Sequence, residues 1–291
     1  MKLKDGITYA HEHITIDLSG IKKDDDCRLD NISETVKELK ELKSKGVNNI
    51  IDVTDRGMGR NIKYLSKVKE DTGINILSST GYYKNPFLPE EVYRLSIKEL
   101  AHIMIDEITN GIEGSGIKAQ VIGEIGTGKE CIFPEEEKVF RAASIAHEET
   151  GRPVVTHTTL GKLGLEQIKI FNEYGVNTDK VVISHVDLSG NLDYILHLID
   201  KGVNVAFDTV GKVNYQPEDV RVGLLKELTE RGLSQKIVLS MDITRKSHFK
   251  YLNGPGYSYL LDKFVPLLKN AGISGADIDN MLKNNAQRIY G

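Results

Sequence analysis

Hydrophobic and polar residues follow two periodicities, one typical of strands and one typical of helices, and segments of the two kinds alternate along the chain. Short runs rich in β-branched residues alternate with longer segments whose apolar residues recur at helical spacing, such as Ser33–Lys45. This alternation is typical of parallel βαβ units. Eight runs are expected to be strands: Ile7–His13, Asn48–Asp55, Asn75–Tyr83, Lys118–Gly126, Pro153–Thr159, Lys180–Asp187, Asn204–Gly211 and Lys236–Ile243.

Eight units of roughly 30 residues would fill the chain without a linker. The pattern therefore predicts an α/β fold, a (β/α)8 TIM barrel, with residues 1–291 forming one domain. An open doubly wound sheet is the main alternative, but it favours a glycine-rich nucleotide fingerprint after the first strand, and none occurs. A long helix at Pro89–Asn110 and a tail at Ser274–Arg288 are predicted as additions to the barrel, and Ile243–Tyr259 as a functional loop.

Composition narrows the classes of partner. The 38 basic and 42 acidic residues give a net charge of -4, which does not favour nucleic acid as a ligand. The two cysteines form no disulfide framework, and we see neither a secretory segment nor an apolar run of about 18 to 20 residues that would span a membrane. We expect a cytoplasmic protein with a small-molecule substrate; a homodimer stays open because no interface is visible in the sequence.

Candidate chemistry collects at the ends of the predicted strands, which all point to one face of a barrel. The first strand ends in His11-Glu12-His13, where the period of two puts both imidazoles on one side and Glu12 on the other. The fourth, fifth, sixth and eighth strands end in Glu124, His157, His185 and Asp242. A single histidine at a strand end is more often structural, and we expect no catalytic role for the helical residues His102, His147 and His197.

Four histidines gathered at one end of separate strands are hard to explain as core packing, because buried polar groups need partners. Six ligand-type side chains are too many for one tetrahedral catalytic site. They suit two hydrolytic metal ions about 3.5 to 4 Å apart with a shared bridge. The sequence therefore predicts a binuclear metal site.

The same residues, with several further segments, resemble the phosphotriesterase family of the amidohydrolase superfamily over essentially the whole chain. The further segments are Gly81-Tyr82-Tyr83, Gly123–Thr127, Gly151-Arg152-Pro153, Thr156-His157-Thr158 and Leu239–Arg245. The resemblance implies that His11, His13 and Asp242 bind the more buried metal and that His157 and His185 bind the more exposed one. Zinc is the metal that the family usually holds. In many relatives a carboxylated lysine is the bridge; here Glu124 stands at that position and supplies a carboxylate directly.

The expected mechanism is attack by a metal-bridging hydroxide, formed because two cations lower the pKa of a bridging water toward about 7. Asp242 is expected to accept the hydroxide proton and pass it toward the leaving group. Tyr83 matches a family position beside the substrate carbonyl and is expected to donate a hydrogen bond there. Packing at the barrel rim is its alternative role.

The sequence carries fewer signals for the substrate than for the metal site. Lactonase relatives that act on acyl-homoserine lactones carry Asp-Arg after the seventh strand, where this chain has Asp208-Thr209, and their eighth loop is longer and apolar. Here that loop offers Arg245, Lys246 and His248, predicted as substrate-binding, which suit an anionic group. We expect a small polar ester or lactone, with a phosphorylated or sugar-derived lactone as one candidate. Phosphotriester or phosphodiester hydrolysis is the alternative reaction, and a metal-binding protein without turnover is the alternative class. Arg28, Arg56 and Arg60, in loops after the first two strands, could contribute to anion binding, but solvated surface charge is the favoured interpretation of each.

Overall fold

Eight parallel strands follow one another around a barrel in the order of the sequence in the computed structural model of the protein, which describes residues 2–291. The strands are β1 (Ile7–Glu12), β4 (Val47–Asp52), β5 (Asn75–Thr80), β6 (Val121–Thr127), β7 (Val154–Thr158), β8 (Val181–Ser184), β9 (Asn204–Phe207) and β10 (Ile237–Leu239). The predicted TIM barrel is confirmed. Most strands end earlier than predicted, so several polar residues expected at strand ends lie in the first residues of the following loops.

Side chains supply the hydrogen bonds at the seam between β10 and β1. The backbone N–H of His11 donates to Oγ of Ser240 at 3.1 Å, and the Ser240 hydroxyl donates to Oε1 of Glu12 at 2.7 Å. The same Glu12 oxygen accepts from the backbone N–H of Met241 at 2.7 Å. Glu12 thus faces away from its two neighbouring histidines, as the period of two predicts, and links the first strand to the last.

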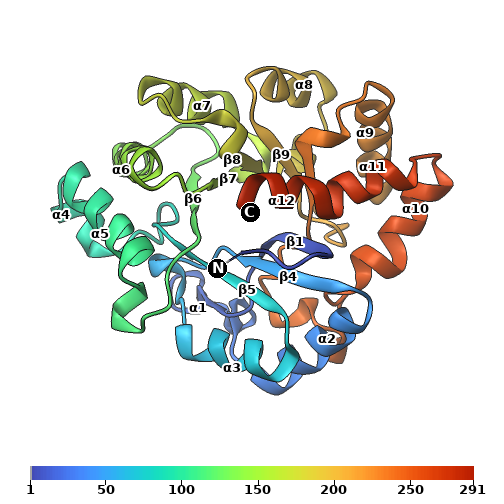
Figure 1. The fold of residues 1–291 in the computed structure, drawn as a ribbon, viewed down its shortest axis with the longest axis horizontal. Coiled ribbons are helices and arrows are strands. Elements are labelled where there is room, and N and C mark those ends of the chain that lie inside the picture. Colours follow the sequence, from blue (N-terminus) through green and yellow to red (C-terminus); the bar gives the residue numbers. More distant parts are fainter. Residues whose placement is uncertain (1) are drawn as a thin grey trace.

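Helices form the outer layer around the strands (Figure 1). They are α1 (Ser19–Lys22), α2 (Ile32–Ser44), α3 (Ile62–Thr72), α4 (Glu90–Arg94), α5 (Ile97–Thr109), α6 (Pro134–Thr150), α7 (Gly164–Glu173), α8 (Leu192–Asp200), α9 (Glu218–Glu230), α10 (Val265–Asn270), α11 (Gly275–Asp279) and α12 (Asn285–Tyr290). Among residues 2–291, no helix has both the length and the apolar character needed to cross a membrane.

The prediction of one long helix over Pro89–Asn110 is wrong, because the chain breaks there between α4 and α5. Leu95 and Ser96 are extended, and Ser96 caps α5. Its hydroxyl accepts from the backbone N–H of Glu99 at 3.3 Å, and the Glu99 carboxylate accepts from the Ser96 N–H at 2.8 Å. This reciprocal capping box satisfies helix-end donors and starts a new helix.

The C-terminal tail closes the end of the barrel at which the strands begin. A π-helical turn at 280–284 joins α11 to α12, so the predicted tail helix is present with one irregular turn. Ile289 and Tyr290 are buried against barrel residues such as Ile51, and the Tyr290 hydroxyl donates to the carbonyl of Ala10 at 3.3 Å. Figure 1 shows the red α12 across this end, beside the N-terminus. The ligand-type residues lie at the opposite end.

The loop after β1 is folded on itself. Two short strands, β2 (Ile16–Asp17) and β3 (Arg28–Leu29), pair antiparallel, and α1 lies between them in sequence. This arrangement places Lys22 in the lining of the cavity at the mouth of the barrel, and the acidic run 24–26 contacts the loop after β10 through Arg245 and Lys246.

Candidate metal centre

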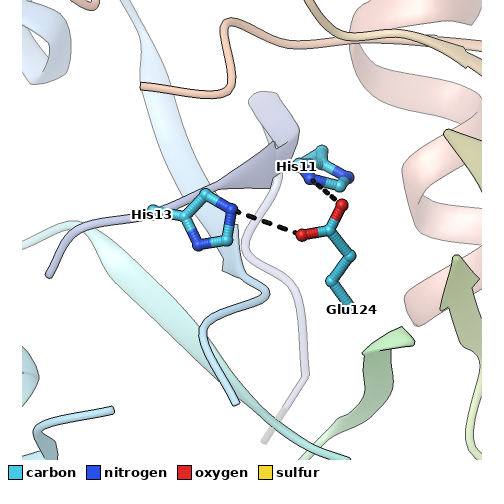
Figure 2. Close-up of side chains that lie close together, drawn as sticks. All are labelled: His11, His13 and Glu124. Carbon is cyan, nitrogen blue, oxygen red and sulfur yellow. Dashed lines mark ion pairs between the residues drawn. The ribbon is translucent and has the colours of Figure 1, made fainter. Parts of the chain in front are cut away.

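Glu124 lies at the centre of a cluster of imidazoles contributed by three other strand ends. Its Oε1 atom lies 2.7 Å from Nδ1 of His157, 3.0 Å from Nε2 of His185 and 3.5 Å from Nε2 of His11. Its Oε2 atom lies 3.6 Å from Nε2 of His13. Figure 2 shows the carboxylate between His11 and His13, with one oxygen directed at each ring. A single carboxylate therefore contacts all four predicted histidine ligands.

Asp242 completes the set from the segment after β10. Its Oδ1 atom lies 3.4 Å from Nε2 of His13 and 3.7 Å from Nε2 of His11. Asp242 and His185 both hold left-handed backbone, with φ of 50° and 60°, a conformation that non-glycine residues seldom adopt. Such strain is found where a site requires a side-chain direction that regular structure does not give. All six predicted ligands thus converge at one mouth of the barrel.

Gly123 allows β6 to carry Glu124 this close to β7. A Cβ atom at Gly123 would lie 2.1 Å from the carbonyl oxygen of Val155, and the residue has φ of 131°. Only glycine fits this backbone without a clash. The residue before the central carboxylate is therefore part of the construction of the cluster.

Hydrogen-bond partners behind the histidines fix the direction of their rings. Nδ1 of His13 lies 2.9 Å from the Thr54 hydroxyl, and Nδ1 of His185 lies 2.8 Å from Oδ1 of Asp208. Nδ1 of His11 lies 3.0 Å from the Ser184 hydroxyl, its hydrogen-bond partner, and 3.2 Å from the other oxygen of Asp208. These contacts leave Nε2 of each of the three rings toward the cluster, as in metal sites where an outer carboxylate or hydroxyl orients the ligand.

The residues present fit divalent metal ions. Imidazole nitrogens and carboxylate oxygens are the donors that catalytic zinc and related metals use. In the part of the chain that the structure describes, three groupings bring their ligand atoms close enough to hold an ion: His11 with His13 and Glu124, Glu124 with His157 and His185, and His11 with His185 and Asp208. Among residues 2–291, Nε2 of His11 is buried without a hydrogen-bond partner, although it points into the cluster. A cation would satisfy this nitrogen.

The electrostatics of the cluster also favour cations. Burial by itself would raise the pKa of Glu124, but the imidazoles of His157 and His11 outweigh it and hold this pKa well below its usual range. Burial lowers the pKa of His157 to about 4, despite the opposing effect of Glu124. At His157 this gives a buried anion beside a neutral imidazole, the protonation state that metal coordination requires. At His13 burial lowers the pKa, but Asp242 and Glu124 outweigh it and raise this pKa to about 10, so a metal ion bound there would displace a proton.

Lys212, in the loop after β9, contacts Asp242 and was not predicted from the sequence. Its ammonium group donates a hydrogen bond to Oδ2 of Asp242, and both side chains are buried. Burial would raise the pKa of Asp242, but the Lys212 cation and the hydrogen bond to His13 hold it below its usual value. Nothing in the sequence marks this pair, because the two residues are 30 positions apart.

Asp208 was also missed as a partner of His11 and His185, although its place after β9 follows the same strand-end rule.

A cavity of about 250 Å³ opens over the cluster, and its lining includes Tyr83, Arg245 and His248. The Tyr83 hydroxyl lies 3.3 Å from Nδ1 of His157, so this predicted catalytic residue borders the cluster. Burial lowers the pKa of His248 to about 4, which makes this ring neutral at physiological pH.

The two basic residues predicted in the eighth loop are already paired with the acidic run of the first loop. Arg245 donates to Asp24 at 2.8 Å and Asp26 at 3.3 Å. Lys246 lies outside the cavity lining and donates to Asp25 at 3.2 Å.

The interpretation of Arg60 as a solvated charge is wrong: its side chain is 1% exposed and is paired with Glu107. Arg56 is also paired with Glu107, at 2.8 Å.

With this geometry in place, comparison with known proteins identifies the family. The family model described as "Phosphotriesterase family" matches residues 2–290. The chain belongs to the phosphotriesterase family. It is 48% identical to the phosphotriesterase homology protein of Escherichia coli (strain K12) over 285 residues, which is 98% of each chain. The crystal structure of that protein, complexed with phosphate in its active site, superposes with a TM-score of 0.97 and covers 99% of both chains.

Two further relatives of this chain carry names that state a reaction. The aryldialkylphosphatase of Saccharolobus solfataricus is 33% identical over 98% of this chain and 95% of its own length. The phospho-furanose lactonase of Mycoplasmopsis synoviae is 30% identical over 98% of this chain and 87% of its own. The family predicted from the motifs is confirmed, and the chain is a hydrolase.

Proposed function

We propose that this member of the phosphotriesterase family uses two divalent metal ions to hydrolyse a small polar ester or lactone, with a phosphorylated or sugar-derived lactone as the first candidate. The observation that carries the proposal is the convergence of four imidazoles and two carboxylates under a cavity of about 250 Å³. A cavity of this volume is small for a ligand site and suits a compact substrate better than a long acyl chain. The phospho-furanose lactonase among the relatives supports the same class.

The six ligand-type residues would hold two ions in two groups. His11, His13 and Asp242 would hold one ion, His157 and His185 the other, and Glu124 would lie between them. Zinc fits this set of nitrogen and oxygen donors. When bound, a metal pair of this kind activates water as a nucleophile near neutral pH and polarises a substrate carbonyl or phosphoryl oxygen.

The protein's own side chains then orient the substrate and move the proton. Oδ1 of Asp242 faces the cluster and is the atom placed to accept a proton from the attacking water, since Lys212 occupies Oδ2. The Tyr83 hydroxyl, beside His157, is placed to donate a hydrogen bond to the carbonyl oxygen of the substrate. Apolar side chains in the cavity wall, such as Met58 and Phe87, limit the access of water.

The test joins metal analysis to an activity panel. We expect purified protein to bind close to two equivalents of zinc, and zinc-loaded protein to hydrolyse at least one member of a panel of sugar lactones, phosphorylated lactones, carboxylic esters and phosphotriesters. Asp242→Asn is expected to lose turnover because an amide cannot accept the proton. If metal is bound and no member of the panel is hydrolysed, the proposal fails. Turnover confined to phosphotriesters would assign the reaction of the aryldialkylphosphatase relative instead.

A further inference from the structure

Four cationic side chains line the cavity above the cluster, and they differ in whether a carboxylate already neutralises them. They are Lys22, Lys84, Lys212 and Arg245. Lys212 is paired with Asp242, and Arg245 with Asp24 and Asp26. Within residues 2–291, Lys22 and Lys84 form no ion pair with a carboxylate. These two therefore hold positive charge that the protein itself does not balance.

The two unpaired ammonium groups lie at the same wall of the cavity. Nζ of Lys22, at the end of α1, lies 5.8 Å from the centre of the Phe87 ring. Nζ of Lys84, in the loop after β5, lies 5.9 Å from the centre of the same ring and 5.5 Å from that of Tyr83. The one hydrogen bond that Lys84 Nζ donates among the described residues goes to the Asn85 carbonyl at 3.2 Å. Aromatic rings orient such cations while leaving their remaining N–H donors available.

Lys84 is also partly withdrawn from water. Burial lowers its pKa, Glu136 and Glu124 oppose this effect, and the neighbouring Lys22 lowers the pKa further. Two like charges without a counter-ion repel each other at this wall. A bound anion would remove the repulsion and would give Lys84 hydrogen bonds in place of those that its ammonium group has lost by partial burial.

The wall lies close to the reacting end of the cavity. Lys84 packs over the ring of Tyr83, and the hydroxyl of that tyrosine lies 3.3 Å from Nδ1 of His157. An anion at the lysines is therefore separated from the cluster by about one aromatic side chain. This spacing matches a compact substrate that has its scissile bond at one end and its charge at the other.

We propose that Lys22 and Lys84 bind an anionic group of the substrate, with phosphate as the first candidate. The two lysines would thereby determine which substrates the enzyme accepts. The inference rests on the proposed hydrolase function, because it names the substrate class of that same cavity. Phosphate is favoured over carboxylate because two ammonium groups match a dianion with three acceptor oxygens better than a monoanion with two. The site differs from the one predicted in the eighth loop, whose Arg245 and Lys246 are already paired.

Equilibrium binding tests the inference without turnover. Zinc-loaded protein is titrated calorimetrically with ribose 5-phosphate, glucuronate and ribose as probes. We expect ribose 5-phosphate to bind best. Lys22→Met and Lys84→Met should each lower the affinity for ribose 5-phosphate about tenfold or more, because each removes a charge-assisted hydrogen bond. Lys84→Arg is expected to recover part of the affinity. Lys129→Met is the matched control, because Lys129 follows β6 at the same face, is paired with Glu130 at 3.3 Å and lies outside the cavity lining.

Kinetics separate this inference from the proposed function. We expect both lysine variants to lower the ratio of kcat/KM for a phosphorylated sugar lactone to that for its unphosphorylated form by about tenfold or more. If the phosphorylated lactone is hydrolysed and neither variant changes this ratio or the affinity for ribose 5-phosphate, the lysine site is refuted while the hydrolase stands. If ribose 5-phosphate binds in a lysine-dependent way but nothing is hydrolysed, the proposed function fails alone. Lysine-dependent binding that is tighter for glucuronate supports the anion site and replaces phosphate by carboxylate.

Discussion

Lys212 donates a hydrogen bond to one carboxylate oxygen of Asp242 and thereby leaves the other oxygen to the metal cluster. That second oxygen, Oδ1, lies 3.4 Å from Nε2 of His13. Without Lys212 this buried carboxylate would lose one counter-charge and the hydrogen bond that fixes Oδ2. The pair therefore fixes both the direction and the ionisation of the residue proposed to accept the proton.

Lys212→Met is expected to lower kcat about tenfold to a hundredfold, because it removes a charge-assisted hydrogen bond to the proton acceptor Asp242. Because the Lys212 cation lowers the pKa of Asp242, its removal raises that pKa. The acid limb of the pH profile of kcat should then move to higher pH. The measurement is a pH–rate series on zinc-loaded protein with a substrate found in the activity panel.

The matched control for this series is Lys226→Met, on the exposed surface of α9. It should leave both the rate and the profile as they are in the unaltered protein. A Lys212→Met profile that superposes on that of the control would show that the ion pair does not tune Asp242.

Asp208→Asn is expected to lower the affinity for metal about tenfold to a hundredfold. Loss of a carboxylate that contacts metal-binding histidines from behind usually has an effect of this size. The two Asp208 oxygens lie 2.8 Å and 3.2 Å from Nδ1 of His185 and His11, and an amide can accept through only one of its two terminal atoms. Competition with a chromophoric chelator measures the affinity. Asp200→Asn, on the exposed end of α8, is the control, and equal affinities in the two variants would contradict the role of Asp208.

Glu107→Gln is expected to lower the free energy of unfolding by about 3 to 5 kcal/mol at neutral pH, because it breaks a buried ion pair from one side. The Glu107 carboxylate accepts from both terminal nitrogens of Arg60 at 2.7 Å and from Thr80 at 2.6 Å. Glu148→Gln, exposed on α6, should change the unfolding free energy little. Denaturant titrations of the metal-free proteins measure both values.

The effect of Glu107 should also depend on pH. Burial raises its pKa, but Arg60 outweighs burial and lowers the pKa below the ordinary value of 4.5. A carboxylate with a lowered folded-state pKa contributes stability above its unfolded pKa and loses it as the pH falls through the folded value. The stability difference between the unaltered protein and Glu107→Gln should therefore shrink below about pH 4.5. A difference that stays constant down to pH 3 would contradict the ion pair.

The six ligands could be predicted from the sequence because the barrel itself gathers strand ends at one mouth. His11 and His13 follow from the period of two, and the other ligands follow from polar residues that close apolar runs. The same rule covers Asp208, which stands directly after β9, although in the sequence analysis Asp208 appears only as a difference from the lactonase pattern. The break before α5 was also visible, since Ser96 and Glu99 have the spacing of a capping box.

Other parts of the site depend on contacts between loops, which sequence periodicity does not encode. Arg245 lies where an anion-binding residue was expected, but its charge is balanced by Asp24 and Asp26, more than 200 positions away. Lys22 and Lys84 meet at Phe87 only because the first and third loops fold over the same cavity. Which cations are free for a substrate is therefore a property of the folded loops.

Removal of metal is expected to lower the thermal unfolding midpoint by several degrees. The cluster holds the carboxylates of Glu124 and Asp242 among four imidazoles, and within residues 2–291 Nε2 of His11 has no hydrogen-bond partner. A cation that binds only the folded state stabilises it by about 4 kcal/mol at a thousandfold excess over its dissociation constant. Chelator should lower the midpoint and added zinc should restore it. In Asp242→Asn the shift produced by zinc should be smaller than in Asp200→Asn, because only the first variant removes a ligand. A midpoint that zinc leaves unchanged in the unaltered protein would mean that these six side chains do not form a metal site.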